Sequence, residues 1–201
     1  MGELQLFDVS AFKEQYKLDV FVETGTGDAT SLRYIISKTN FLKYYSIEIY
    51  KPLCDIAKKE FIHNTNVEII NDSSYNGLKQ IFTKINLDNR IFFWLDAHFP
   101  DADFGGPNQY SSIKDKTLRI PLEEELKLIK ESRSNCKDFF IIDDLRIYED
   151  NNYEKGNWKD RELYGGNNID FVYKYFSDTH IITKLMNHQG YLILVPKEQK
   201  L

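Results

Sequence analysis

Charged residues that can bind a metal or move a proton follow the two most apolar stretches of the chain. "FFWLDAHF" contains Asp96 and His98, and "FFIIDDLR" contains Asp143 and Asp144. Three carboxylates that converge without matching basic residues repel one another, and a divalent cation relieves that repulsion. Carboxylate oxygens suit Mg²⁺, and a histidine beside them can accept a hydroxyl proton near neutral pH. These residues therefore predict a site for a divalent cation.

A glycine turn lies earlier in the chain, in "DVFVETGTGDATSL" at residues 19–32. A strand, a glycine turn and the start of a helix bind nucleotides because their backbone N–H groups and the helix dipole face the ligand. The third glycine of the dinucleotide fingerprint would fall at Thr30, so Gly25 and Gly27 also fit a plain tight turn. The turn alone leaves both interpretations open.

Acidic residues at the ends of the next two predicted strands favour the nucleotide interpretation. Glu48 follows Gly25 at close to the spacing, about 20 residues, at which an acid on a second strand binds ribose hydroxyls. Asp72 and Ser73 end the third strand, where the edge of a nucleobase would lie. Together with the turn they predict an adenosine-binding site, although acids at strand ends also cap helices.

The elements that must position these residues alternate along the chain as short apolar runs and longer amphipathic runs. This alternation is typical of βαβ units and a parallel sheet, in which ligands bind beyond the carboxyl ends of the strands. Two further strand-like runs, "HIITKLMNH" and "GYLILVPK", are too close for a crossover helix, so we expect an antiparallel hairpin at the sheet edge. The predicted strands are residues 19–25, 43–49, 67–73, 90–98 and 138–144, and the predicted helices are residues 29–38, 50–61, 74–85, 121–132 and 168–176.

From Asp19 to the terminal hairpin the chain resembles the class I S-adenosylmethionine-dependent methyltransferases, whose first motif, an acid followed by Gly-x-Gly, is matched by "VETGTG". The resemblance implies one α/β domain over residues 1–201 with the Rossmann-like methyltransferase fold: a mostly parallel seven-stranded sheet, helices on both faces and a C-terminal antiparallel hairpin. It implies S-adenosyl-L-methionine as the cofactor. Glu23 disfavours NAD, because an acid repels a pyrophosphate but attracts the α-amino group of S-adenosylmethionine. The implied cofactor-binding residues are Glu23, Thr24, Gly25, Thr26, Gly27, Glu48, Asp72, Ser73 and Asp96.

The acidic strand ends are similar to those of the macrocin- and novobiocin-type small-molecule O-methyltransferases, in which an Asp after strand four and an Asp-Asp pair after strand five bind a divalent metal. By position this implies Asp96, Asp143 and Asp144 as metal ligands, with Mg²⁺ the expected ion. The implied reaction is methyl transfer to a hydroxyl of a small molecule such as a sugar or a phenolic natural product. Asp96 and His98 are the expected catalytic residues. His98 fits a general base, a metal ligand or a structural hydrogen bond, and the sequence does not choose among them.

Three other interpretations fit parts of the sequence. "WLDAHFPD" resembles the Asp-Ala-His-x-Asp metal motif of arginase-like hydrolases, but Asp101 comes one residue late and the partner motifs are absent. The others are an S-adenosylmethionine-binding module without turnover and a methyltransferase of proteins or nucleic acids. The intact Asp96, Asp143 and Asp144 disfavour the module, and the negative charge of the chain disfavours nucleic acid.

Composition excludes several classes of protein. The 201 residues carry 26 basic and 31 acidic side chains, a net charge of -5, and contain no run of Lys and Arg long enough to follow a phosphate backbone. No stretch has the length and apolarity to cross a bilayer, and Cys54 and Cys136 are not in a C-x-x-C pair. We therefore expect a cytoplasmic enzyme of small molecules, with no nucleic-acid or membrane partner, and compatible with a homo-oligomer.

Two long segments without regular periodicity, residues 99–119 and 147–167, follow strand ends that carry acids. Loops of this length in a compact domain are commonly lids or binding loops. The aromatic residues of the second segment fit either a substrate lid or an anchor to the core; they are Tyr148, Tyr153, Trp158 and Tyr164. His63, His180 and His188 have no partners nearby in the sequence, so we expect them at the surface or at helix caps.

Overall fold

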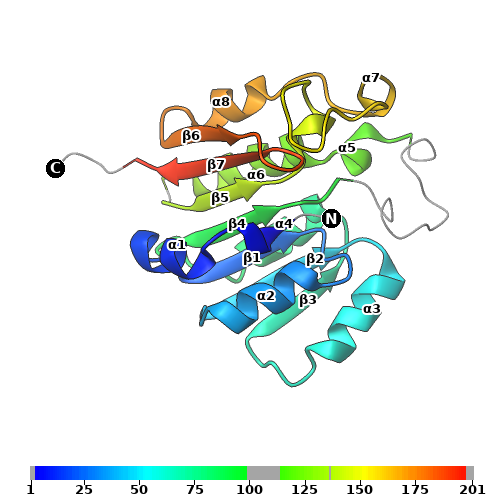
Figure 1. Cartoon of the computed structure of the whole chain (residues 1–201). Helices are drawn as coiled ribbons and strands as arrows, with labels where there is room; N and C mark the ends of the chain where they lie inside the picture. The colour runs from blue at the N-terminus through cyan, green and yellow to red at the C-terminus, as the bar shows by residue number, and fades with distance from the viewer. Residues whose placement is uncertain (1–2, 99–113, 136, 198–201) are drawn as a thin grey trace.

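Seven strands pair into one sheet in the order β3-β2-β1-β4-β5-β7-β6 (Figure 1). The computed structural model describes residues 3–98, 114–135 and 137–197. All strands of the described chain run in the same direction except β7, which is antiparallel to β5 and β6. This confirms the predicted sheet and hairpin. The strands are β1 Val20–Thr24, β2 Lys43–Glu48, β3 Val67–Asn71, β4 Ile91–Leu95, β5 Phe139–Ile142, β6 His180–Leu185 and β7 Tyr191–Pro196.

Helices cover both faces of the sheet, as the sequence predicts (Figure 1). One face packs against α1, α2 and α3, and the other packs against α4, α6 and α8. The helices are α1 Val9–Tyr16, α2 Thr30–Lys38, α3 Lys51–Glu60, α4 Ser74–Phe82, α5 Lys116–Arg119, α6 Leu122–Arg133, α7 Arg161–Tyr164 and α8 Asp170–Phe176, with 3-10 turns η1 Leu4–Leu6 and η2 Leu145–Ile147.

The central strands are buried on both faces, which is why they read as continuous apolar runs in the sequence. All five residues of β4, "IFFWL", are buried. Phe92 and Trp94 pack with the α1, α2 and α3 layer, whereas Ile91, Phe93 and Leu95 pack with the α4, α6 and α8 layer. Alternation along the strand thus divides its side chains between two cores. The residues that follow β4 emerge from this packed layer, so the layer fixes their positions.

A glycine lets α4 approach the sheet closely. A Cβ at Gly77 would lie 2.7 Å from Ile47 Cγ2 of β2, closer than real side chains come. Ser73 caps the same helix, because its Oγ accepts a hydrogen bond from Asn76 N at 3.3 Å. The first turn of α4 is thereby held beside the carboxyl end of β2.

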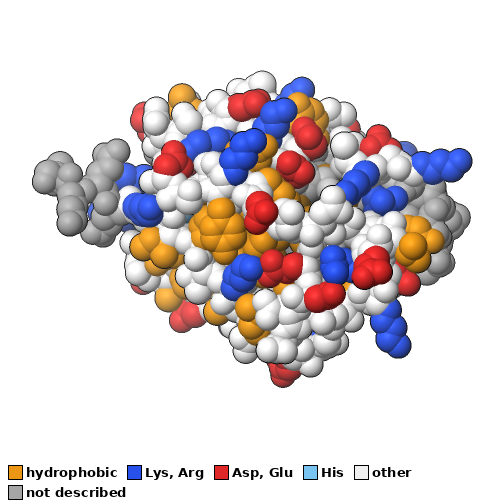
Figure 2. Space-filling model, turned by 90° about the horizontal axis from the view of Figure 1, so that it is seen from above, with side chains coloured by type: hydrophobic (Ala, Val, Ile, Leu, Met, Phe, Trp, Pro, Cys, Tyr) orange, Lys and Arg blue, Asp and Glu red, His pale blue; other side chains and the backbone are white. Residues whose placement is uncertain are grey.

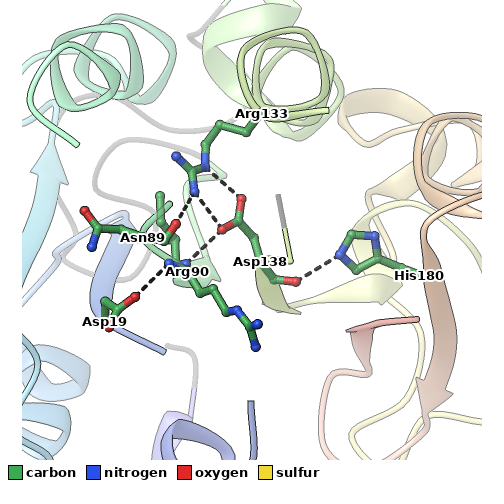
Figure 3. A network of polar contacts seen from close by, with 7 residues as sticks. Asp19, Asn89, Arg90, Arg133, Asp138 and His180 are labelled. Carbon is green, nitrogen blue, oxygen red and sulfur yellow. Dashed lines mark hydrogen bonds and ion pairs between the residues drawn. The ribbon is translucent and has the colours of Figure 1, made fainter. Parts of the chain in front are cut away.

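At the amino-terminal edge of the strands, a buried ion pair joins α6 to the start of β5 (Figure 3). Asp138 accepts hydrogen bonds from Arg133 Nε at 2.8 Å, from Arg133 Nη2 at 2.9 Å and from Ile91 N at 2.8 Å. Arg133 Nη2 also donates to Asn89 O at 2.6 Å, and His180 Nε2 lies 2.9 Å from Asp138 O. The charge of Asp138 is therefore paired, and its oxygens are satisfied.

Four features depart from the sequence predictions, and one is that Arg161–Tyr164 form α7 within the predicted loop 147–167. Helix α1 forms in a segment for which the sequence predicts no element. The prediction of a surface or capping position for His180 is wrong: the side chain is buried, because its ring hydrogen-bonds inside the core to Asp138 O. Of the predicted loop 99–119, residues 99–113 lie outside the described residues, and Lys116–Arg119 form α5.

The strand β6 lies at one edge of the sheet, and Figure 2 views the molecule from the side of β6 and α8. Acidic and basic side chains are intermixed there with hydrophobic areas, and charges at an edge disfavour pairing with a strand of another molecule.

Among the described residues, no helix has the length and apolarity needed to cross a membrane.

Candidate functional site

The predicted site residues gather at the carboxyl edge of the sheet, around β1. The chain continues from β1 to β2 on one side, while β4 lies on the other side, so the strand order reverses at this point. Open α/β sheets bind ligands in the crevice at such a reversal. Glu23, Glu48, Asp96 and Asp143 lie in or directly after strands that end there. The glycine turn and the acidic strand ends therefore share one edge.

Backbone geometry requires both glycines of the turn after β1. Gly25 and Gly27 have φ angles of 83° and 54°, in the left-handed region that favours glycine. A Cβ at Gly25 would also lie 2.7 Å from Asp96 O, so this glycine lets the turn contact the loop after β4. Gly25 N donates to Ile47 O at 2.9 Å. The turn is thus held between the ends of β2 and β4.

Glu48 holds the turn from the end of β2. Its Oε2 accepts a hydrogen bond from Gly27 N at 2.8 Å, and its Oε1 accepts one from Tyr50 N at 2.7 Å. Burial raises the pKa of Glu48, and the backbone N–H groups of Tyr50, Gly27 and Ile49 oppose that rise. A carboxylate has about four acceptor positions, so Glu48 keeps acceptor capacity for a ribose while it organises the turn.

Glu23, the acid of "VETGTG", lies inside the protein beneath the turn. It is fully buried, and its Oε2 accepts a hydrogen bond from Ser46 Oγ at 2.5 Å, which in turn lies 2.6 Å from Thr26 Oγ1. Burial raises the pKa of Glu23 well above its usual range, and the charge of Asp96 adds to the rise. Glu23 therefore ties β1 to β2, and its Oε1 makes no hydrogen bond to the described residues.

Asp72 and Ser73, the predicted nucleobase contacts, take part in the start of α4. Asp72 Oδ1 accepts hydrogen bonds from Ser73 N at 2.8 Å and Asn76 Nδ2 at 3.1 Å. Asp72 Oδ2 accepts one from Gln80 Nε2 at 2.9 Å, and Ser73 caps the helix. Three of the roughly four acceptor positions of the carboxylate are thus occupied within the protein. Both side chains have a capping role in addition to any contact with a ligand.

The acidic strand ends bring Asp96, His98 and Asp143 together. One side-chain ligand atom from each lies within 4.8 Å of the others, a grouping that can hold a metal ion. His98 Nε2 is 2.9 Å from Asp96 Oδ1. Asp143 is buried, yet neither of its oxygens makes a hydrogen bond to the described residues. Because a buried carboxylate without partners is costly, Asp143 requires a proton or a cation.

The negative charges around Asp143 also indicate that this carboxyl requires a proton or a cation. Burial raises the pKa of Asp143 well above its usual range, and the charges of Asp96 and Asp144 add to the rise. A divalent cation reverses this balance, because it favours ionised carboxylates. Positive charge at the cluster would therefore stabilise this end of the sheet.

Asp144, the third predicted metal ligand, has a partner of its own. Its φ of 57° turns the chain sharply after β5, and its Oδ1 accepts a hydrogen bond from Arg146 Nε at 2.8 Å. Its Oδ2 lies 3.8 Å from His98 Nε2. Burial raises the pKa of Asp144, while His98 and Arg146 oppose the rise. The structure thus groups Asp96 and Asp143 with His98, and Asp144 lies beside them with its charge paired to Arg146.

Glu125, in the first turn of α6, is a candidate that the sequence analysis does not predict. Only 1% of the residue is exposed, and the hydroxyls of Ser74 and Thr24 lie beside its carboxyl group. Burial raises the pKa of Glu125 to about 7, and the hydroxyls of Ser74 and Thr24 and the charge of His98 oppose the rise. Glu125 therefore belongs to the same edge as the predicted site.

The periodicity of apolar residues in α6 could have identified Glu125 from the sequence. Leu122, Leu126 and Ile129 are buried at positions i, i+4 and i+7 of α6, and Glu125 occupies position i+3 on the same face. Glu123 lies off this face and is exposed. A charged residue on the apolar face of a helix is unusual, so the pattern marks one of three consecutive glutamates as special.

The segment 147–167 is anchored to the core. Tyr148 and Tyr153 are buried, and Trp158 packs against the same hydrophobic cluster. A Cβ at Gly190 would lie 2.3 Å from Tyr153 Cε1, so the hairpin turn packs directly on this ring. Of the two interpretations of these aromatic residues, the buried tyrosines favour the anchor.

No protein-family model matches the chain, and no curated protein matches its sequence. Solved structures do match it. A methyltransferase from Podospora anserina bound to S-adenosylhomocysteine has a TM-score of 0.59 and 11% identity, with 94% of this chain and 76% of that chain covered. An O-methyltransferase from Bacillus cereus, also in complex with S-adenosylhomocysteine, has a TM-score of 0.59 and 11% identity, covering 98% and 82%. A methyltransferase from Geobacter sulfurreducens has a TM-score of 0.55 and 11% identity, covering 98% and 79%.

These similarities extend over almost the whole chain and concern the path of the backbone. They confirm the Rossmann-like methyltransferase fold that the sequence predicts. Sequence identity this low establishes the fold alone, and one fold hosts many activities. The activity therefore has to be argued from the residues at the carboxyl edge of the sheet.

Proposed function

We propose that the protein is an S-adenosylmethionine-dependent methyltransferase that methylates a hydroxyl of a small molecule, assisted by a divalent cation, in the manner of the macrocin- and novobiocin-type enzymes. The observation that carries the proposal is the contact between the glycine turn and the backbone at Asp96, a residue of the acidic cluster: a Cβ at Gly25 would lie 2.7 Å from the carbonyl oxygen of Asp96. Methyl transfer needs the methyl donor and the group that deprotonates the acceptor side by side, since the protein mainly orients the reactants.

The residues of the turn fit the cofactor. Gly25 and Gly27 keep the backbone free of side chains, and Glu48 retains acceptor capacity for a ribose diol. Asp96, whose backbone contacts the turn, suits a ligand with positive charge and opposes a pyrophosphate, while Glu23 and Glu48 hold the turn through hydrogen bonds. Thr24, Thr26, Asp72 and Ser73 complete the proposed cofactor-binding set. When bound, S-adenosylmethionine supplies an electrophilic methyl group.

The acidic cluster fits a hard divalent cation such as Mg²⁺. Asp143 offers two buried oxygens that have no partner among the described residues, and Asp96 offers a further carboxylate beside it. Asp144, whose Oδ2 lies 3.8 Å from His98 Nε2, completes the proposed ligand set of Asp96, Asp143 and Asp144. A cation there supplies positive charge that favours the deprotonated form of an acceptor hydroxyl.

His98 is the residue that we assign to the proton. Its Nε2 faces Asp96 Oδ1 at 2.9 Å, so a proton on Nε2 is held by the carboxylate and Nδ1 is the basic nitrogen. Asp96 thereby orients the ring and fixes its tautomer. His98 Nδ1 would hold the proton that the acceptor hydroxyl loses, while bound S-adenosylmethionine would supply the methyl group through cleavage of its S–CH3 bond and leave as S-adenosylhomocysteine.

We also propose that residues 1–201 act as one domain, in the cytoplasm, on small molecules and not on nucleic acids or membranes. The net charge of -5 supports this, because a phosphate backbone requires clustered basic residues. A binding module without turnover would need the glycine turn but would not need Asp143 buried and unpartnered.

Transfer of label from S-adenosylmethionine carrying a tritiated methyl group, to a panel of sugars and phenols, tests the proposal. We expect transfer with Mg²⁺, little transfer after exhaustive chelation, and little transfer by Asp143→Asn. Asp170→Asn, which makes the same change at an exposed position of α8, should behave as wild type. Full transfer after chelation would overturn the role of the cation, and cofactor binding without transfer to any acceptor would favour the binding module.

A further inference from the structure

Tyr191 is a buried polar residue that the proposed function does not use. It begins β7 directly after the hairpin turn, and its side chain is fully buried. Its ring packs against Phe7, with ring centroids 5.1 Å apart, and against Trp94, with centroids 6.3 Å apart. Its hydroxyl makes no hydrogen bond to a side chain of the described residues. Buried hydroxyls normally have hydrogen-bond partners, so the surroundings of this one indicate what it serves.

The strand register places Tyr191 beside Asp143. Ile142 of β5 lies opposite Leu192 of the antiparallel strand β7, so Asp143 is opposite Tyr191 one residue further along. Asp143 N donates a hydrogen bond to Leu95 O at 3.1 Å, which continues the ladder between β4 and β5 to this residue. Residues directly opposite each other on antiparallel strands have Cβ atoms about 4.5 to 5.5 Å apart. Tyr191 is therefore the neighbour of Asp143 across the sheet.

The charges around the Tyr191 hydroxyl agree with this register. Burial raises the pKa of Tyr191 above its ordinary value, and the charges of Asp143, Glu3 and Asp96 add to the rise. The backbone N–H of Glu3 opposes the rise, so this donor lies beside the hydroxyl oxygen. A hydroxyl whose oxygen faces a donor still has its own proton to give. The Asp143 carboxyl is the matching acceptor, because no side chain of the described residues donates to it.

We infer that Tyr191 is a positioning residue for the cation site: its hydroxyl donates a hydrogen bond to one oxygen of Asp143 and leaves the other oxygen for the cation. The inference rests on the proposed function, which places a cation at Asp96, Asp143 and Asp144. Carboxylates that bind metals are themselves held by hydrogen bonds that orient them. A cation favours the ionised carboxylate, which is a stronger acceptor than the acid, so cation binding and the hydrogen bond strengthen each other.

Tyr191→Phe tests the inference because it removes the hydroxyl and keeps the ring that packs against Phe7 and Trp94. Affinity for Mn²⁺, followed by electron paramagnetic resonance, should fall by about tenfold, as expected when a metal ligand loses its hydrogen-bond partner. The urea midpoint of unfolding should change little, because the ring packing is retained. Tyr45→Phe, the same change at a buried tyrosine of β2, should bind Mn²⁺ as the wild type does.

A double-mutant cycle separates the positioning of Asp143 from a general effect on the fold. In the background of Asp143→Asn, Tyr191→Phe should weaken Mn²⁺ binding by less than about threefold, because a neutral amide is a weaker acceptor than a carboxylate. An equal loss of Mn²⁺ affinity in the two backgrounds would show that Tyr191 does not act through Asp143, and it would overturn the inference.

Ultraviolet difference absorption gives a second readout, on the unaltered protein. A tyrosine that donates to an ionised carboxylate absorbs at longer wavelength, so Mg²⁺ should produce a tyrosine difference spectrum in the wild type and in Tyr45→Phe, and none in Tyr191→Phe. A wild-type protein that binds Mn²⁺ without any tyrosine signal, or a Tyr191→Phe variant that retains the signal, overturns the inference. Failure of the wild type to bind Mn²⁺ contradicts the proposed cation site itself.

Discussion

Two buried aspartates at opposite ends of β5 have contrasting surroundings. Asp138, before the strand, and Asp143, after it, are each 2% exposed. Asp138 accepts hydrogen bonds from Arg133 and from Ile91 N, whereas Asp143 accepts none from the described residues. Burial raises the pKa of both, but Arg133 opposes the rise at Asp138, while Asp96 and Asp144 add to it at Asp143.

The contrast separates a structural charge from a functional one. The paired charge of Asp138 is complete and holds α6 to the amino ends of β4 and β5 (Figure 3). At the carboxyl edge, Glu23 and Asp143 keep buried oxygens without partners among the described residues. Such groups lower stability unless a ligand satisfies them, and strongly perturbed acids cluster at functional sites. The amino end of the sheet therefore has its buried charge paired within the protein, whereas the carboxyl end keeps buried acids that a ligand can pair.

The largest loss of stability should come from breaking the buried ion pair between Arg133 and Asp138. Arg133→Met leaves the charge of Asp138 buried and unpaired, and we expect the free energy of unfolding to fall by about 3 to 5 kcal/mol. Urea denaturation measures this change. Arg33→Met, which breaks the exposed pair between Arg33 and Glu60, should cost less than about 1 kcal/mol. Equal losses of unfolding free energy in the two variants would contradict the claim that the buried ion pair matters more for stability than the exposed one.

At the carboxyl edge of the sheet, the free energy of unfolding should depend on pH because folding raises the pKa of Glu125. Its pKa of about 7 in the folded protein is above the value in the unfolded chain, so its contribution to stability is complete below about pH 4.5 and is lost as pH rises through 7. Relative to Glu125→Gln, the wild type should lose on the order of 3 kcal/mol between these limits. Urea denaturation at a series of pH values gives the difference, and parallel curves for the two proteins would show that folding does not raise the pKa of Glu125.

Glu48→Ala tests the residue that connects the turn to the proposed ribose contact. The variant loses an acceptor for the ribose and also the hydrogen bonds from Gly27 N and Tyr50 N that order the turn. We expect binding of S-adenosylhomocysteine to weaken by about 1.5 to 3 kcal/mol, with the fold intact. Glu60→Ala is the matched control on the exposed face of α3. Calorimetric affinity equal to that of the wild type would remove Glu48 from the site.

Asp143→Asn should have the smallest effect on folding and a clear effect on cation binding. The free energy of unfolding should stay the same or rise slightly, because the change removes an acid that has no partner to lose in the described structure. Affinity for Mn²⁺, followed by electron paramagnetic resonance, should fall by about tenfold or more, as expected when a charged ligand is lost. Asp170→Asn should bind as the wild type does. Undiminished Mn²⁺ binding by Asp143→Asn would place the cation elsewhere.

Periodicity was sufficient to predict the fold. The strands β4 and β5 read as continuous apolar runs because both of their faces are buried, and the short link between β6 and β7 allowed only a hairpin. Helix α1 was missed because its pattern is brief: one residue, Val9, is fully buried, and Phe12 and Tyr16 are only partly buried. The residues that follow strand ends could be located in advance because strand order decides where they meet.

The partners of the site residues could not be predicted, because they depend on contacts between distant segments. The sequence places Asp143 and Asp144 side by side, but in the structure Asp144 has a positive φ and pairs with Arg146, whereas Asp143 lies with Asp96 and His98. Burial of His180 likewise depends on a hydrogen bond to Asp138 O, 42 residues away in the chain.

Calorimetric titration of the wild-type protein with S-adenosylmethionine, S-adenosylhomocysteine and NAD tests the central claim most directly. The acidic side chains that gather at the carboxyl edge suit a cofactor with positive charge better than a pyrophosphate. The account predicts saturable binding of the first two ligands at one site and no binding of NAD. Binding of NAD alone, or binding of none of the three, would contradict it.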